Sequence, residues 1–253
     1  MFQLLQDLPS RRIGKRIEDA GRCFHISQFS EIAKYCYPVA REPSPPSSLA
    51  RDKFDREPPW LHFPPLASML LPDANTLPTL VADRIVIRPL AATDVPAVFE
   101  IFGNPEVARY GSSPALTRLE EAEQLVTDIH TLFAARSLFQ WGIALRDNDA
   151  VIGTCTLAHI DTTHRRAEIG FALARAHWRR GYVAEALPKV LEFAFEVLGC
   201  HRIEADVDPR NTASLRTLER AGFQREGYLH HRYFVHDEWH DSVMLGLLAP
   251  TSQ

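Results

Sequence analysis

Between residues 80 and 250, apolar residues recur with two different periods, which predict a succession of strands and helices. Runs that are apolar at every second position, or apolar throughout, indicate strands. Apolar residues three and four positions apart indicate amphipathic helices. The predicted strands cover 85–90, 139–145, 151–160, 167–174, 202–207, 227–234 and 242–248. The predicted helices cover 95–102, 117–133, 182–198 and a short stretch that begins at 211.

Residues at the ends of these elements support their boundaries. Thr117 with Glu120 matches a capping box at the start of the second helix, and Gly199 is suited to end the third. The stretch 147–149, Asp-Asn-Asp, has the residues of a tight turn and joins two strands into a hairpin. The order β-α-α-β-β-β-α-β-α-β-β predicts one α+β domain with a mixed sheet.

Proline separates the chain into two parts. Ten of the 18 prolines lie between Pro38 and Pro78, a density that excludes regular helix and sheet. We therefore predict a low-order N-terminal extension with a Pro-rich linker over 1–77 and a folded domain over 78–250. Met69 raises the hypothesis that translation starts there and that the preceding residues are dispensable.

Composition and charge narrow the classes of function. The chain has 253 residues, 45% of them hydrophobic, and a net charge of -4, which gives no general attraction to nucleic acid or to an anionic membrane. No apolar run approaches the roughly 18 residues of a membrane span. The four cysteines, Cys23, Cys36, Cys155 and Cys200, are scattered without paired spacing, which favours a reducing compartment. We expect a cytoplasmic protein without nucleic-acid or membrane partners.

The stretch 178–186, Trp-Arg-Arg-Gly-Tyr-Val-Ala-Glu-Ala, predicts an anion-binding turn. It lies after an apolar strand and before an amphipathic helix. Gly181 permits a tight turn, and the amides of the first helical turn then point at a bound phosphate. A second short helix opens at 211–214, and the two segments together indicate a ligand with a diphosphate and a long polar arm.

Seven stretches of the chain, in order, resemble the GNAT superfamily of acetyl-coenzyme A dependent N-acetyltransferases, and in particular its ribosomal-protein alanine/serine (RimJ/RimL-like) branch. The stretches are DRIVIRPL (83–90), AEIGFAL (167–173), WRRGYVAEA (178–186), LGCHRIEA (198–205), NTAS (211–214), AGF (221–223) and WHDSV (239–243). The resemblance implies a mixed, mostly antiparallel central sheet flanked by helices. It covers 83–248 and excludes the N-terminal extension.

The resemblance also implies which residues bind acetyl-CoA, the acetyl donor. The amides of 179–184 are expected to hold the diphosphate, and Val183 departs from the small residue that the family usually has there. Strand amides from Phe171 to Leu173 are expected to bind the pantetheine arm and polarise the thioester carbonyl. Asn211 resembles the family's pantetheine-binding asparagine, and it is also suited to cap its own helix. The donor-binding residues are thus Phe171, Ala172, Leu173, Arg179, Arg180, Gly181, Tyr182, Val183, Ala184 and Asn211.

Two residues are candidates for the proton transfers. An alkylammonium has no free lone pair, so a base must deprotonate it before it attacks a thioester, and Glu168 is the candidate, directly or through a water. Ser214 is the candidate to protonate or position the leaving thiolate. Many relatives have a tyrosine at the position of Leu218. A surface glutamate and an ordinary helix-terminal serine remain the alternative interpretations.

The acceptor side is less sharply predicted. The segment 104–110, with Tyr110, is expected to form one wall, and His231 and Tyr233 of the closing hairpin the rim, with Trp141 as a further candidate. Several histidines crowd this hairpin, yet alternate residues of a strand point to opposite faces, so we expect no metal. An ordinary surface loop at 104–110 is the alternative.

These expectations combine into transfer of an acetyl group to a primary amine by direct attack in a ternary complex, without an acyl-enzyme. The branch resemblance favours a protein N-terminus as acceptor. Two alternatives stay open: a small amine such as a polyamine, amino acid or antibiotic, or a non-catalytic acyl-CoA sensor. The sequence is compatible with a monomer or a homodimer.

Overall fold

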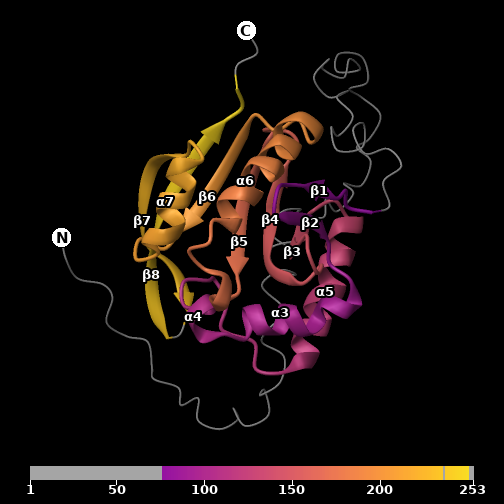
Figure 1. Cartoon of the computed structure of the whole chain (residues 1–253). Coiled ribbons are helices and arrows are strands. Elements are labelled where there is room, and N and C mark those ends of the chain that lie inside the picture. The colour runs from indigo at the N-terminus through magenta and orange to yellow at the C-terminus, as the bar shows by residue number, and fades with distance from the viewer. Residues whose placement is uncertain (1–75, 236, 251–253) are drawn as a thin grey trace, which may run out of the picture. The chain divides into compact units, whose positions relative to one another are not determined.

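The computed structural model describes residues 76–235 and 237–250, which form a mixed eight-stranded sheet with helices on both faces (Figure 1). The strand order across the sheet is β1-β2-β3-β4-β5-β6-β8-β7. The strands are β1 (Leu80–Val81), β2 (Ile85–Pro89), β3 (Phe139–Leu145), β4 (Val151–Asp161), β5 (Arg166–Leu173), β6 (Arg202–Val207), β7 (Gln224–Val235) and β8 (Glu238–Leu248). The α-helices are α3 (Val95–Phe102), α4 (Pro105–Ala108), α5 (Leu119–Ala134), α6 (Tyr182–Glu192) and α7 (Thr212–Arg220).

Most predicted elements are confirmed, some to the residue. Strands β3 and β6 and helix α3 have the predicted bounds. The cap of α5 differs by one position, because the side chain of Glu121, not Glu120, accepts from the amides of Thr117 and Arg118. The predicted helix 182–198 is α-helical only to Glu192 and ends in a π-helical turn over Phe193–Val197.

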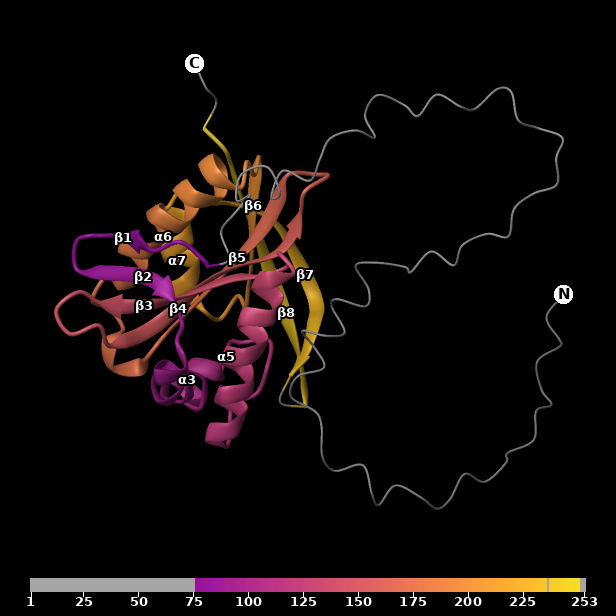
Figure 2. The ribbon, with the colours of Figure 1, turned by 90° about the vertical axis from the view of Figure 1, so that its right-hand side faces the viewer.

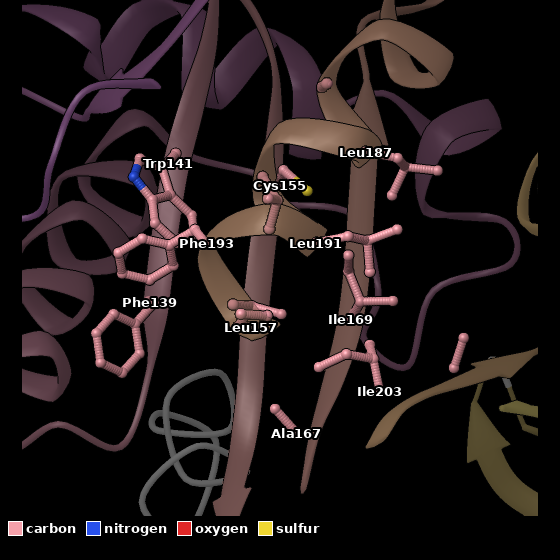
Figure 3. Packing of buried hydrophobic residues seen from close by; sticks show 14 of the residues in the cluster. Phe139, Trp141, Cys155, Leu157, Ala167, Ile169, Leu187, Leu191, Phe193 and Ile203 are labelled. Atoms are coloured by element: carbon pink, nitrogen blue, oxygen red, sulfur yellow. The ribbon is translucent and has the colours of Figure 1, made fainter. Parts of the chain in front are cut away.

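The two faces of the sheet carry separate clusters of buried residues. Neighbouring residues of one strand point to opposite faces, and Ile143 and Ala144 accordingly belong to different clusters. The larger cluster packs the sheet against α6 and α7, and Leu187 and Leu191 of α6 lie over Ile169 (Figure 3). The smaller one packs the sheet against α3 and α5, which lie together below α6 and α7 in Figure 2.

One strand pair in the middle of the sheet is short. All neighbouring strands are antiparallel except β5 and β6, which are parallel. These two pair only at Arg166↔Arg202, Ala167↔Ile203 and Glu168↔Glu204, although each strand continues beyond that point. The second half of β5 is therefore paired with β4 alone, and the carboxyl ends of β5 and β6 part.

The predicted extension over 1–77 lies, with Met69, almost wholly outside the described residues. Leu77 is described and is only 6% exposed in the larger core cluster, so the folded region includes this residue. Among the helices of 76–235 and 237–250, none is at once long and apolar enough to span a bilayer.

Candidate active site

The turn into α6 has the backbone geometry of an anion-binding site. Gly181 is the N-cap of α6 with φ 84°, and Arg179 before it also has a positive φ, 61°. The first bond of the helix runs from the amide of Glu185 to the carbonyl of Gly181 at 3.1 Å. The amides of 182–184 therefore have no acceptor within the helix, and they lie at the positive end of its dipole. Arg179, Arg180 and Gly181 are all exposed, so a ligand can reach the turn.

Arg84 holds this turn from the other end of the sequence. Its amide and its Nε donate to the carboxylate of Glu185 at 2.5 and 2.9 Å, and its guanidinium donates to the carbonyl of Arg180 at 3.1 Å. The guanidinium also lies over the ring of Tyr182, 4.8 Å from its centroid. Sequence reasoning missed Arg84, whose 96-residue separation from Arg180 carries no local signal.

The unpaired edge of β5 presents backbone amides to the opening between the strands. The amide of Ala174 donates to Ile152 of β4, and amides alternate along a strand, so those of Phe171 and Leu173 turn away from β4. The carbonyl of Leu173 accepts from the indole of Trp178 at 2.6 Å, which links the end of β5 to the turn. A Cβ built on Gly170 would meet nothing within 4 Å, so this strand faces open space there.

The connection from β6 into α7 carries Asn211 and Ser214. The side chain of Asn211 accepts from the amide of Ser214 at 3.2 Å, so Asn211 caps its own helix. Because β5 and β6 are parallel, the turn at Gly181 and the cap at Asn211 both follow the carboxyl ends of the two parting strands. Leu218, at the position where the resemblance implies a tyrosine, is 1% exposed and belongs to the core, so it supplies no acid there.

A β-bulge brings a histidine to Glu168. Ala158 pairs with Glu168, and Asp161 is the next residue of β4 in register, with Arg166. Within this bulge His159 has φ 49°, and its Nδ1 lies 3.0 Å from Oε2 of Glu168. The hydrogen bond to Glu168 raises the pKa of His159 above its ordinary value, although burial acts in the opposite direction. Bulges re-aim side chains in this way, yet sequence reasoning missed His159 because nothing local marks the bulge.

The predicted acceptor residues fall into different surroundings. The hydroxyl of Tyr233 donates to Oδ2 of Asp206 at 2.8 Å. Burial raises the pKa of Tyr233, and the nearby charge of Glu168 adds to the rise. The ring of His231 stacks on Trp239 at the exposed edge of the sheet. Tyr110 follows α4, whose Glu106 pairs with Arg175 directly after β5, so this segment lies at the carboxyl end of β5.

Trp141 lies apart from the other predicted site residues. It is fully buried, donates to the carbonyl of Pro78 at 2.8 Å, and packs edge-on against Phe193 with ring centroids 5.3 Å apart (Figure 3). It therefore offers no exposed surface to a substrate.

The described histidines of the closing hairpin have separate partners. His230 lies 3.4 Å from Asp241, while His240 is buried 3.5 Å from Asp208. His236 lies outside the described residues. Since His231 is stacked on Trp239, these side chains do not converge on one point.

The two described cysteines are poorly suited to nucleophilic catalysis. Burial raises the pKa of Cys155 to about 12 and that of Cys200 to about 11, so both remain thiols near neutral pH.

Comparison with known proteins decides the family. A sequence profile of the acetyltransferase (GNAT) domain matches residues 84–224, more than half of the chain. The chain belongs to the GNAT acetyltransferase family. A curated relative, the uncharacterized N-acetyltransferase YoaA of Bacillus subtilis (strain 168), is 34% identical over 173 residues, which are 68% of this chain and 98% of the relative.

Solved structures extend the likeness to the fold. RimJ of Mycobacterium smegmatis in complex with CoA-disulfide matches this GNAT protein with a TM-score of 0.64 and 22% identity, over 69% of this chain and 89% of the other. A spermidine N-acetyltransferase from Vibrio cholerae in complex with CoA and spermine matches with a TM-score of 0.59 and 21% identity. The match covers 65% of this chain and 95% of the other. The predicted fold class and family resemblance are thus confirmed, and the protein is an acetyl-CoA-dependent N-acetyltransferase.

Proposed function

We propose that this GNAT protein acetylates the N-terminal α-amine of a protein, by direct attack of the amine on acetyl-CoA within a ternary complex. One observation carries the proposal: β5 and β6 part after three residue pairs, and the exposed left-handed turn at Gly181 follows the carboxyl end of β5. An extended thioester fits such an opening, with its diphosphate at the turn and its arm along β5. A protein acceptor is favoured by the similarity in fold to a structure described as a putative ribosomal-protein-serine acetyltransferase from Vibrio cholerae, which is 23% identical with a TM-score of 0.58.

On the donor side, backbone groups carry most of the binding. The amides of 182–184 hold the diphosphate, and Arg179 and Arg180 add positive charge. The outward amides of Phe171 and Leu173 bind the pantetheine arm and polarise the thioester carbonyl. Asn211 binds the arm through its amide nitrogen, because its oxygen already caps α7.

On the acceptor side, Glu168 is the proton acceptor. The carboxylate takes a proton from the ammonium, directly or through a water, and the freed nitrogen attacks the thioester carbon. The tetrahedral intermediate then collapses with cleavage of the C–S bond. The thiolate takes the remaining proton of the attacking nitrogen, and Ser214, one turn into α7, donates a hydrogen bond to the departing sulfur. His159 keeps Glu168 oriented through the 3.0 Å contact.

Tyr110, His231 and Tyr233 form the acceptor wall in this proposal. Trp141 has no part in it, because it has no exposed surface. In this proposal the protein acts in the cytoplasm, a reducing compartment in which the free, buried thiols of Cys155 and Cys200 stay reduced.

The test compares acceptors that differ in one feature. Thiol release from acetyl-CoA is measured with a peptide that has a free α-amine and a lysine, with the same peptide N-acetylated, and with spermidine. We expect turnover with the first peptide and none with the second, because only the α-amine differs between them. Turnover with spermidine alone would assign a small amine instead, the activity named for a Vibrio cholerae relative that is 24% identical. Tight coenzyme binding without turnover on any acceptor would leave a sensor.

A further inference from the structure

A buried carboxylate on β6 gathers three donors from the closing hairpin. The side chain of Asp206 is 3% exposed. It accepts from the hydroxyl of Tyr233 at 2.8 Å, from Nε of Arg232 at 3.3 Å and from the hydroxyl of Ser242. Tyr233 and Arg232 come from β7 and Ser242 from β8, so one carboxylate ties both strands of the hairpin to β6.

An irregularity in β7 aims these donors at Asp206. Leu229 pairs with Ser242 and Tyr233 with His240, so four steps along β7 oppose two along β8. On the outer side Asp241 fixes the irregular segment, since it accepts from the amide of His231 at 2.8 Å and from the hydroxyl of Tyr228 at 2.7 Å. One aspartate therefore holds the segment on each side. The Asp206 side chain is buried and its Tyr233 is half-buried, whereas Asp241 is partly exposed and its Tyr228 is exposed.

The Asp206 group lies close to the proposed proton acceptor. Glu204 is the register partner of Glu168, and Asp206 follows two residues later on the same face of β6, where β6 has left β5. The negative charge of Glu168 raises the pKa of both Asp206 and Tyr233, though burial is the larger cause for each. The hydrogen bond to Glu168 raises the pKa of His159, and the charge of Arg232 partly opposes that rise. Asp206 and its partners thus interact electrostatically with the His159–Glu168 pair, where β5 and β6 part.

The hydrogen-bond direction in this group has a chemical consequence. A carboxylate only accepts, so the phenolic proton of Tyr233 is committed to Asp206. The phenolic oxygen also interacts with the Arg232 side chain, and one lone pair is left to accept from another donor. Burial raises the pKa of Tyr233, so the phenol stays protonated. A primary amine or ammonium is such a donor, and it retains N–H groups after one has been directed at Glu168.

We propose that Asp206 is a positioning residue of the acceptor site, which orients Tyr233 so that its oxygen accepts a hydrogen bond from the acceptor amine beside Glu168. This inference rests on the proposed function. It adds residues of the hairpin that the family profile does not reach, because that match ends at residue 224.

The experiment uses a matched pair of tyrosines on one strand. Tyr233→Phe and Tyr228→Phe each remove one phenol that donates to an aspartate, but only Tyr233 donates to Asp206. In the full-length protein we expect Tyr233→Phe to raise the KM for the acceptor about tenfold, the effect of one lost hydrogen bond. The KM for acetyl-CoA stays unchanged, and Tyr228→Phe leaves both constants as in the wild type.

The variant Asp206→Asn tests the coupling. It keeps the shape but places an amide among three donors, so we expect it to raise the acceptor KM as Tyr233→Phe does, and the double variant to be no worse than either. Three results would overturn the inference. They are additive effects in the double variant, an Asp206→Asn variant that lowers Tm without raising the acceptor KM, and equal effects of the two tyrosine variants on the acceptor KM. If Asp206→Asn does not fold, the tyrosine pair decides alone. A wild type that binds acetyl-CoA but acetylates no amine instead ends the proposed function, and the inference with it.

Discussion

The proposed donor side and the proposed acceptor side of this site are built in different ways. The donor side is contiguous in sequence: backbone amides of the turn at Gly181 and of the first turn of α6 form the proposed phosphate site. The acceptor side is assembled from side chains of separate strands: His159 on β4, Glu168 on β5, Asp206 on β6 and Tyr233 on β7. A site built from backbone amides tolerates changes of side chain, whereas the acceptor side depends on each side chain and on two bulges.

This difference fits the chemistry of the two substrates. Every acyl-CoA has the same diphosphate and arm, which the backbone of a helix start and a strand edge can bind. Acceptor amines differ in their surroundings, so selection between them requires specific side chains. We therefore expect variants on the acceptor side to change turnover and acceptor KM, and variants on the donor side to change coenzyme affinity.

The largest expected effect tests whether Glu168 belongs to the acceptor side. Glu168→Gln removes the base, and we expect kcat to fall about 10²- to 10³-fold, most strongly at low pH where the acceptor is most fully protonated. The measurement is a pH profile of kcat. The control is Glu204→Gln, at the register partner of Glu168, because Glu204 accepts from Arg166 and Arg202 and has no part in the proposed proton transfer. A pH profile of Glu168→Gln that follows the wild type would remove this residue from the mechanism.

The next effect tests the donor side by itself. Gly181→Val forces a β-branched residue to φ 84°, which costs more than the ~1–2 kcal/mol of an ordinary residue there and disturbs the proposed phosphate site. We expect coenzyme affinity to fall about 10- to 100-fold in a binding titration.

Gly222→Val is the matched control for this variant. Gly222 has φ 98°, and a Cβ on either glycine has its nearest neighbour at 3.4 Å, but Gly222 follows the far end of α7. Both variants lose Tm, and only Gly181→Val loses coenzyme binding. An equal loss of coenzyme binding in Gly181→Val and Gly222→Val would mean that backbone strain, and not the turn at Gly181, controls the affinity.

The smallest expected effect concerns the His159–Glu168 pair. The pKa of His159 is raised in the folded state, so the stability that the pair contributes is fully present below the unfolded value near 6.5 and is lost as pH rises through the raised value. The His159 side chain is 44% exposed, which limits this contribution to less than about 1 kcal/mol.

We therefore expect His159→Gln to be less stable than the wild type at pH 5.5 and nearly equal to it at pH 9. Thermal unfolding at the two pH values checks this. A constant difference in Tm across the range would show that the histidine acts through packing and not through its charge.

The fold was largely predictable because its signals are local. Hydrophobic period gave strands β3 and β6 and helix α3 their bounds, and Gly199, with φ 65°, lies after the end of the third predicted helix. The π-helical end of that helix was not predictable, since a π turn follows from packing against the sheet and leaves the apolar period almost unchanged.

The candidate site was predictable only in part. The turn at Gly181 could be recognised because a glycine before an amphipathic helix has one strong structural meaning. Trp141 illustrates the opposite case. An aromatic residue in a strand belongs to a site or to the core depending on which face of the sheet it lies on, and the sequence alone does not determine that face. Here it is fully buried against Phe193.

The sequence by itself determined the order of the elements, the turn at Gly181 and the family, because each depends on residues close together in the chain or on motifs in a fixed order. Only the tertiary structure decided which side chains meet Glu168. Contacts such as His159 with Glu168 and Asp206 with Tyr233 arise from register, bulges and the parting of two parallel strands. The physical reason is that backbone conformation follows local chemistry, whereas the meeting of distant side chains follows from how whole strands pair.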